Sequence, residues 1–409
     1  MFDKVICPYC FTKFWPQSIA FRCQRRTCSN FNEPDTALLR FYGKVPDDNI
    51  KGHIIAPRLR ITTPQSGKCD VCSGESHTMV CPQCHNSLPR QLVEGGGRII
   101  AIVGARNSGK SNFITVLIDQ LQRQAHLLGD IGVLAIDYPN SDKLSTTRRY
   151  NAYRTQLYDK GECIEATATL DELTRVPLIY KLSQKGRKPT FLVLYDTAGE
   201  NFANIIGKSY VADGTAENAD VKFLQAADAI IYLLDTFTIE AVHDKLAGKM
   251  QLAPIGPANP RYDDILGKLI QYFDEELPKP DRNRLKRTPI AFAFSKFDAV
   301  LDDPDLSRAL PNMNKESDSE YLDGNGVDIS TLDAQSDIID AALSQIWHEN
   351  NFLQNVKQFF ENYHFFGFSA LGGVPDRNNR VAGGRPRPYR VLDPLVWVLS
   401  RLNYRFKLK

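Results

Sequence analysis

The chain has 409 residues, which is enough for two or three domains and for a sizeable core. Its 43% hydrophobic and 24% charged residues are typical of a globular protein, and a net charge of +2 gives no general attraction to nucleic acid or membranes. Its apolar runs fall short of the roughly 20 residues that span a bilayer, and the start, MFDKVICPYC, lacks the apolar stretch of a signal peptide. We therefore expect a cytoplasmic protein with no membrane partner.

Eight of the nine cysteines lie in four close pairs, Cys7/Cys10, Cys23/Cys28, Cys69/Cys72 and Cys81/Cys84. A two-residue spacing lets both sulfurs reach one tetrahedral zinc, and sets of four thiolates predict two structural zinc sites rather than a catalytic thiol. We favour sequential pairing, with the first two pairs on one zinc and the last two on the other. Pairing of Cys7 and Cys10 with Cys81 and Cys84 is the alternative. Cys163 stands alone and is expected to be a small buried residue.

A basic and aromatic stretch lies beside the second cysteine pair. It contains Arg22, Arg25, Arg26, Phe14, Trp15 and Phe21. Such a mixture suits contact with RNA or DNA, so a nucleic-acid partner stays open. A small core stabilised by the aromatic rings is the favoured alternative.

The composition divides the chain into three parts. Residues 1–92 form the cysteine-rich module of zinc ribbons, the glycines of EGGGR predict a linker at 93–97, and 98–409 form one α/β domain. Sequence not assigned to the core elements leaves room for insertions near 139–170, 237–261 and 300–335. Polar residues 312–326 have few apolar anchors and are expected to be disordered.

Apolar runs that alternate with amphipathic stretches predict a mixed, mainly parallel six-stranded sheet with helices on both faces. The strands are expected at 98–105, 177–182, 190–196, 227–235, 289–298 and 365–370, with an additional candidate at 132–138. A short connection makes the strands at 177 and 190 an antiparallel hairpin. Helices are expected at 110–128, 262–277, 334–363 and 393–404, whereas the basic clusters at 184–188 and 282–287 are expected to be solvated loops.

The stretch GARNSGKS, from Gly104 to Ser111, follows a buried strand and precedes a helix. It fits the phosphate-binding pattern G-x-x-x-x-G-K-[ST], in which backbone N–H groups and a helix N-terminus hold the phosphates. Lys110 is expected at the β- and γ-phosphates and the Ser111 hydroxyl on magnesium. The predicted nucleotide-binding residues here are Gly104, Arg106, Asn107, Ser108, Gly109, Lys110, Ser111 and Asn112.

A second polar motif, DTAGE, follows the strand FLVLY. Asp196 is placed at the carboxyl edge of the sheet, where a carboxylate can hold magnesium directly or through water. Gly199 can present a backbone N–H to the γ-phosphate.

With the next strands, the sequence resembles the Ras-like, translation-factor-related branch of P-loop GTPases. Ser-Lys-x-Asp, from Ser295 to Asp298, looks like a variant of the family's Asn/Thr-Lys-x-Asp motif. By that resemblance Asp298 accepts hydrogen bonds from guanine, and Lys296 lies along the base. FSAL is similar to the family's Ser-Ala motif, which implies base contacts from Ser369, Ala370 and Leu371, with the Ala370 N–H on guanine O6.

The resemblance also implies two loops that respond to the γ-phosphate, one of them the DTAGE loop. The other should carry a magnesium-binding threonine, for which we choose Thr167 over Thr169 and Thr174. Glu200 stands where Ras-like proteins have the glutamine that orients water, which predicts slow GTP hydrolysis unless a partner accelerates it. Asn107 resembles the asparagine of potassium-dependent GTPases, and turn chemistry explains it equally well.

The whole layout, including PYRVLDPLVWVL at 388–399, resembles the bacterial double-GTPase families. It implies a GTPase switch that uses GTP/GDP, magnesium and two structural zinc ions, and acts in a defence or conflict system. The implied protein partner is a second GTPase or an activating protein. Two alternatives remain: a nucleotide-bound scaffold without turnover, and an ATP-using P-loop protein that acts on nucleic acid.

Overall fold

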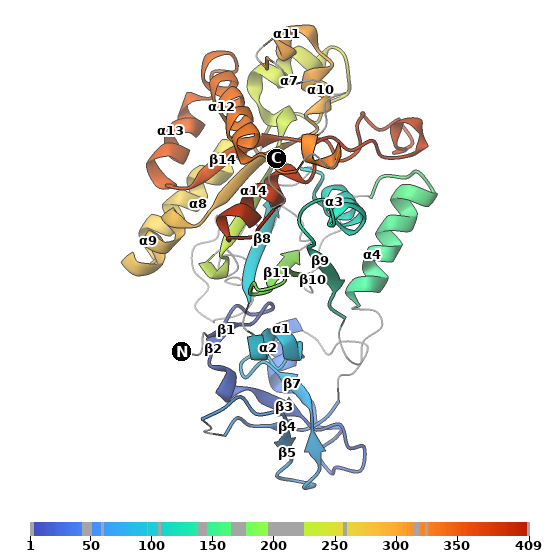
Figure 1. Ribbon diagram of the computed structural model, residues 1–409, viewed down its shortest axis with the longest axis vertical. Helices are drawn as coiled ribbons and strands as arrows, with labels where there is room; N and C mark the ends of the chain where they lie inside the picture. The colour runs from blue at the N-terminus through green and yellow to red at the C-terminus, as the bar shows by residue number, and fades with distance from the viewer. Residues whose placement is uncertain are drawn as a thin grey trace.

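The computed structural model describes most of the chain, and Figure 1 shows its arrangement. The described residues are 4–42, 51–58, 61–95, 97–104, 108–137, 145–164, 177–194, 225–256, 260–308, 310–311, 313, 319–323 and 326–406. Among these residues, we find no helix with the length and apolar character needed to cross a membrane.

A seven-stranded sheet forms the centre of the α/β part, in the order β14-β13-β12-β8-β11-β10-β9. The first five strands are parallel to one another, whereas β10 is antiparallel to both β11 and β9. The strands are β8 (Arg98–Gly104), β9 (Gly132–Ala135), β10 (Leu178–Ser183), β11 (Thr190–Leu194), β12 (Ala229–Asp235), β13 (Ile290–Ser295) and β14 (Tyr363–Gly367). The mixed sheet and the hairpin are confirmed. The expected count of six is wrong, because the candidate at 132–138 does form β9.

Helices cover both faces of the sheet because its strands alternate between two buried clusters. Ala101 of β8 belongs to the cluster that contains α7, α8 and α13, whereas Ile102 belongs to the cluster that contains α3 and α14. The α-helices are α3 (Lys110–Gln124), α4 (Thr146–Arg154), α7 (Glu240–Ala247), α8 (Tyr262–Glu276), α9 (Lys279–Arg287), α10 (Asp298–Leu301), α11 (Pro304–Ser307), α12 (Ile329–Gln345), α13 (Asn350–Phe359) and α14 (Asp393–Arg401). Shorter helical turns are Thr155–Asp159, Thr236–Thr238, Glu320–Asp323 and Ala382–Gly384.

Two expectations about this part were wrong. The single helix at 334–363 is two helices, and His348, with a left-handed φ of 56°, lies in the turn between them. The basic segment 282–287 belongs to α9, whose Leu285 is buried in the core. Of the segment 312–326, expected to be disordered, residues 313, 319–323 and 326 are described, and among them Met313, Ser319 and Tyr321 are buried. The rest of the segment lies outside the described residues.

The N-terminal module consists of very short elements below the large sheet (Figure 1). Its antiparallel sheets are β1–β2, β4–β3–β7 and β5–β6. The elements are β1 (Val5–Ile6), β2 (Lys13–Phe14), a helical turn at Pro16–Ser18, β3 (Ala20–Arg22), α1 (Thr36–Tyr42), β4 (Ile54–Ile55), β5 (Gly67–Lys68), β6 (Glu75–Ser76), β7 (Thr78–Val80) and α2 (Arg90–Gly95). Helix α2 includes the first residues of the expected linker 93–97.

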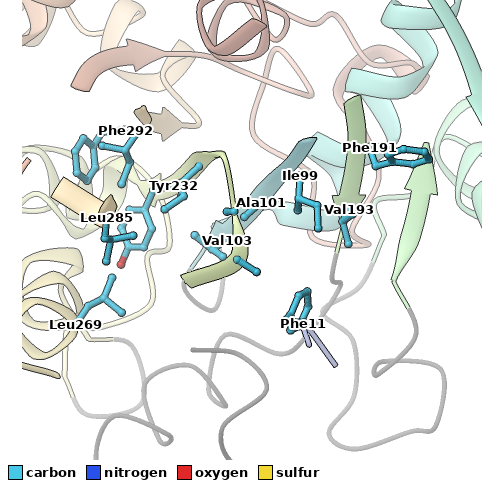
Figure 2. Close-up of a cluster of buried hydrophobic side chains, with 14 of the residues drawn as sticks. Phe11, Ile99, Ala101, Val103, Phe191, Val193, Tyr232, Leu269, Leu285 and Phe292 are labelled. Atoms are coloured by element: carbon cyan, nitrogen blue, oxygen red, sulfur yellow. The ribbon is translucent and has the colours of Figure 1, made fainter. Parts of the chain in front are cut away.

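The module packs against the sheet through Phe11, which lies in the cysteine loop between β1 and β2. Figure 2 shows the Phe11 ring beneath Ile99 and Ala101 of β8 and Val193 of β11, in one buried cluster. The same cluster contains Val93 of α2. The division into 1–92, 93–97 and 98–409 stays a prediction, and the core is continuous across it.

Candidate functional site

Gly104 and Gly109, at the two ends of the segment between β8 and α3, have backbones that fit a phosphate-binding loop. Gly109, directly before α3, has a left-handed φ of 72°, a conformation that glycine adopts without steric cost. Gly104 ends β8, and a Cβ there would lie 2.6 Å from the Ser108 hydroxyl oxygen and 2.9 Å from the Leu233 Cβ. Neither position accepts a larger residue without strain. Arg106 and Asn107 lie outside the described residues.

Lys110 and Ser111 are the first two residues of α3, where the helix N-terminus carries its partial positive charge. Each is only 8% exposed, so both polar side chains are held within the site rather than extended into solvent. Ser108, in the preceding loop, is also buried. A buried lysine and a serine hydroxyl at the N-terminus of a helix form a chemistry suited to phosphate and magnesium.

Asn112, the third residue of α3, has partners within the protein. Its side-chain amide donates to the Ile164 carbonyl oxygen at 3.4 Å, and its side-chain oxygen accepts from the Ile164 N–H at 3.1 Å. We expected Asn112 at the nucleotide, whereas these contacts tie it to the chain just before residue 165. Thr167 lies three residues further on, outside the described residues.

The expected base-binding residues gather at the carboxyl ends of β12 and β13. The Lys296 ammonium nitrogen lies 2.7 Å from an Asp235 carboxylate oxygen and 4.9 Å from the centre of the Phe237 ring. Ser295 donates its hydroxyl to the Leu234 carbonyl oxygen at 3.0 Å, and Asp298 is 3% exposed at the start of α10. Asp235 and Phe237 were not predicted. The only sequence signal for Asp235 is a carboxylate at the end of a buried strand.

The loop after β14 is joined to this group through the backbone. The Phe297 N–H donates to the Phe368 carbonyl oxygen at 3.1 Å, and the ring of Phe297 lies where a Cβ on Gly367 would be, at 2.5 Å. Ser369, buried Ala370 and half-buried Leu371 follow directly. The structure therefore brings the residues of SKFD and FSAL to the same edge of the sheet. Asp196, Gly199 and Glu200 lie outside the described residues.

The eight paired cysteines form two clusters, and the favoured sequential pairing was wrong. Cys7 and Cys10 cluster with Cys81 and Cys84, while Cys23 and Cys28 cluster with Cys69 and Cys72. One site is nested inside the other because β3 pairs with β7, which brings the first and last cysteine pairs together. Cys163 is buried, as expected.

The geometry of both clusters fits zinc. The Sγ–Sγ distances are 3.7 Å for Cys7–Cys84, 3.7 Å for Cys10–Cys81 and 3.6 Å for Cys23–Cys72. Four sulfurs at about 2.3 Å from a tetrahedral zinc lie roughly 3.8 Å apart. Burial raises the pKa of Cys7 and of Cys84, whereas hydrogen bonds from Cys7 and the other cysteines lower the pKa of Cys10. A divalent cation would hold all four as thiolates and provide only structural stability, because no ligand position is left open.

Three of the four cysteine pairs share one backbone arrangement. The N–H of the residue after the second cysteine donates to the first cysteine's carbonyl oxygen at 3.0 Å, for Phe11, Ser73 and His85. Each of these three residues has a left-handed φ of 56–57°. The Cys23/Cys28 pair, with four intervening residues, lacks this arrangement among its described contacts. The spacing thus distinguishes three regular loops from a fourth irregular one.

Arg22, considered for nucleic-acid contact, is fully buried. It donates to Asp35 at 2.8 Å, and His85 lies 2.8 Å from the other oxygen of the same carboxylate. Phe14 and Phe21 are also buried, whereas Trp15 is 47% exposed. These contacts confirm the small-core alternative for Arg22 and the two phenylalanines. Arg25 and Arg26 stay exposed.

The chain is similar to a curated protein and to solved structures. Among curated proteins, the chain is 26% identical over 333 residues to the "Putative ESX-1 scaffolding and assembly protein SaeC" of Mycolicibacterium smegmatis, across 78% of this chain and 79% of that protein. Among solved structures, the Arl6 BBS3 small GTPase of Trypanosoma brucei with bound GppNp covers 75% of this chain and 98% of its own, at 12% identity and a TM-score of 0.30. The match to the GTP-bound Ski7 GTPase-like domain of S. cerevisiae covers 76% of this chain and 51% of that chain, at 10% identity and a TM-score of 0.30.

A family model described as Double-GTPase 2 matches residues 98–337, more than half of the chain. The match starts at β8 and includes the phosphate loop, the DTAGE segment and SKFD. The resemblance to double-GTPase families that these motifs carry is thereby confirmed. The chain belongs to the Double-GTPase 2 family.

Proposed function

We propose that this chain binds GTP and GDP with magnesium and hydrolyses GTP slowly, as a switch whose turnover depends on a protein partner. The observation that carries the proposal is the β8–α3 junction, where Lys110 and Ser111 begin a helix behind Gly109. Lys110 would neutralise phosphate charge, and Ser111 would hold magnesium, which supplies further charge stabilisation when bound. Asp196 would be a second magnesium contact, and Gly199 would contact the γ-phosphate.

Guanine selectivity in this proposal comes from Asp298, Lys296 and the turn at 369–371. A buried carboxylate such as Asp298 accepts the two neighbouring N–H donors of guanine, and adenine lacks that pair. The Ala370 N–H would donate to guanine O6, with Ser369 and Leu371 on either side. Ser295 already donates to Leu234, so it would support this site through the backbone.

Hydrolysis would depend on positioning and charge rather than on covalent chemistry. Thr167 and Glu200 are our candidates for closing on magnesium and for orienting the attacking water. A carboxylate at position 200 can accept the proton of the water, but it repels the γ-phosphate, which is why slow intrinsic turnover is expected. A partner that supplies positive charge would accelerate it. By the double-GTPase resemblance, the proposed partner is a second GTPase or an activating protein, in a defence or conflict system.

A scaffold that binds nucleotide without turnover is the second candidate. The relative named as a scaffolding and assembly protein favours it. In that case the N-terminal module, with Trp15, Arg25 and Arg26 exposed, would contact a protein. Nucleic acid is the weaker alternative, because the most enclosed of its three arginines is used internally.

The first experiment is calorimetric titration of the zinc-loaded chain with GTP, GDP and ATP in magnesium. We expect GTP and GDP to bind and ATP to bind at least a hundredfold more weakly, as discrimination by a buried hydrogen-bonding group requires (roughly 10⁴-fold in well-built sites). Asp298→Asn should abolish the preference for guanine, whereas Asp264→Asn, an exposed aspartate on α8, should retain it. Equal binding of ATP by the unmodified chain would contradict the proposal.

Turnover separates the switch from the scaffold. Phosphate release from GTP is measured with the chain alone and with a candidate partner GTPase, in potassium and in sodium. Slow release that the partner accelerates supports the switch, and release that requires potassium assigns Asn107 to a potassium ion. Loss of the basal rate in Lys110→Ala, with Gln122→Ala on the same helix unaffected, shows that the site is responsible. Tight GTP binding with no release under any condition supports the scaffold.

A further inference from the structure

A buried charged network lies directly behind the expected base-binding turn. The Arg390 guanidinium donates to one Asp393 carboxylate oxygen at 3.0 Å and to the Tyr389 hydroxyl at 3.2 Å. The other Asp393 oxygen accepts from the Tyr321 hydroxyl at 2.5 Å and from the Ser319 hydroxyl. All five residues are buried, and Asp393 is the first residue of α14. We call Tyr389, Arg390, Asp393, Ser319 and Tyr321 the Arg390 network.

The network is attached to the turn through the backbone of Tyr389. The Ser369 N–H donates to the Tyr389 carbonyl oxygen at 3.0 Å, and the Tyr389 N–H donates to the Ser369 carbonyl oxygen at 2.8 Å. The Ser369 hydroxyl oxygen then accepts from the Gly372 N–H at 2.9 Å, which closes the turn around Ala370 and Leu371. Tyr389 is therefore the residue against which this turn is aligned.

The backbone at Arg390 shows that its position is imposed. Arg390 has a φ of 51°, a left-handed conformation that costs a residue with a side chain about 1 kcal/mol or more. A buried ion pair also contributes little net stability, since its replacement by apolar residues of similar volume often leaves a protein equally stable or more stable. The strained backbone and the buried ion pair of Arg390 are better explained by a role in positioning the neighbouring turn than by a contribution to the stability of the fold. The Arg390–Asp393 pair holds the strained residue, and the strained residue orients Tyr389.

We propose that Arg390 is a positioning residue for the base-binding turn, and that through Tyr389 it sets how closely the Ala370 N–H approaches the O6 side of guanine. The inference rests on the proposed guanine-nucleotide function. It extends that function to a side chain that does not touch the nucleotide. Tyr321 and Ser319, from the segment before α12, strengthen the same pair by holding the Asp393 carboxylate from its other side.

The substitution that tests the idea is Arg390→Lys, because it keeps the charge but cannot reach Asp393 and the Tyr389 hydroxyl together. Tyr321→Phe is a milder variant that removes one hydrogen bond to Asp393 and leaves Arg390 in place. Arg385→Lys changes an exposed arginine of the same loop and is the matched control. Folding of each variant is verified by thermal melting and by zinc content.

The measurement is the affinity of each variant for GTP, 6-thio-GTP and ITP. Sulfur at position 6 is a poorer acceptor than oxygen, so the ratio of GTP to 6-thio-GTP affinity reports the Ala370 contact. ITP keeps O6 and lacks the 2-amino group, so the ratio of GTP to ITP affinity reports Asp298.

In Arg390→Lys we expect GTP affinity to fall about tenfold, as for one lost hydrogen bond. The ratio of GTP to 6-thio-GTP affinity should fall toward one. The ratio of GTP to ITP affinity should stay unchanged. Tyr321→Phe should lower the ratio of GTP to 6-thio-GTP affinity by a smaller factor. Arg385→Lys should have the same affinities as the unmodified chain. Two unchanged ratios in a folded Arg390→Lys, or two ratios that fall together, would overturn the inference. Failure of the unmodified chain to prefer GTP over ATP would overturn the proposed function itself.

Discussion

The Lys296 ammonium group lies 2.7 Å from the Asp235 carboxylate. Asp235 ends β12 and Lys296 directly follows the parallel strand β13, in which Ser295 lies opposite Asp235. The Asp235 side chain also accepts from the Phe237 N–H at 3.1 Å, so it is fixed by the backbone that follows it. Lys296 has a left-handed φ of 57°, which directs it across the edge of the sheet rather than along β13. The pair therefore holds a lysine in place beside the expected base site before a nucleotide arrives.

Asp235→Asn tests this arrangement because asparagine keeps the acceptor for Phe237 and removes only the charge. We expect affinity for GTP and for GDP to fall equally, by about tenfold, which is the magnitude of one hydrogen bond to a charged group. Competition with a fluorescent guanine nucleotide measures both constants. Asp264→Asn on α8 is the control. An unchanged affinity would mean that Asp235 has no role in positioning Lys296.

Asn112→Ala tests the connection between α3 and the chain before residue 165. The two hydrogen bonds from Asn112 to Ile164 hold that segment, and Thr167 is proposed to close on magnesium only in the triphosphate state. We expect GTP affinity to fall about five- to tenfold, as for one or two lost hydrogen bonds, and GDP affinity to stay within twofold. If Asn112 contacted the nucleotide directly, as the sequence predicted, both affinities would fall together. The ratio of the two constants separates these outcomes.

The strands of the sheet could be predicted because each is an apolar run that ends at polar or glycine residues, as in β8, β12 and β13. The junction of β8, Gly109 and α3 could be predicted because a glycine-rich pattern between an apolar run and an amphipathic run has backbone requirements that few other patterns share. The break between α12 and α13 could not, because the turn between them has a left-handed histidine at position 348 rather than a proline or glycine. The Asp235–Lys296 pair depends on the register of two strands distant in sequence, and no local pattern encodes it.

The pairing of cysteines failed for a similar reason. Local spacing predicts which two sulfurs share a metal, but the assignment of pairs to one zinc depends on which strands meet. Antiparallel pairing of β3 with β7 brings Cys81 and Cys84 to Cys7 and Cys10 and leaves the inner pairs to each other. The Tyr389–Ser369 backbone pairing escaped prediction in the same way, because it joins two loops without a repeating pattern.

Zinc counts in double variants test the nested pairing directly. We expect two zinc ions per unmodified chain, one in Cys7→Ser with Cys81→Ser, and none in Cys7→Ser with Cys28→Ser, because a structural site does not tolerate loss of a thiolate. With sequential pairing, the zinc counts of the two double variants would be exchanged. Cys163→Ser, which changes the buried cysteine outside both clusters, should retain both ions. Metal analysis after gel filtration gives the counts.

Phe11→Ala tests whether the N-terminal module and the sheet share one core. The Phe11 ring is 6% exposed and lies beneath Ala101 and Val193, so its removal leaves a cavity at the junction (Figure 2). We expect the free energy of unfolding to fall by about 3 kcal/mol, the usual cost of replacing a buried phenylalanine with alanine. Trp15→Ala, which removes a half-exposed ring 5.2 Å from the Lys4 ammonium group, should cost less than about 1 kcal/mol.

Because Phe11 belongs to the same buried cluster as residues of β8 and β11, its loss should have a second effect. Two unfolding transitions should replace one when the module no longer packs on β8 and β11, and the zinc count should stay at two because the thiolates are unchanged. Denaturant unfolding monitored by tryptophan fluorescence and by zinc release distinguishes the transitions. A single transition with a loss no greater than that of Trp15→Ala would show that the module does not depend on this contact.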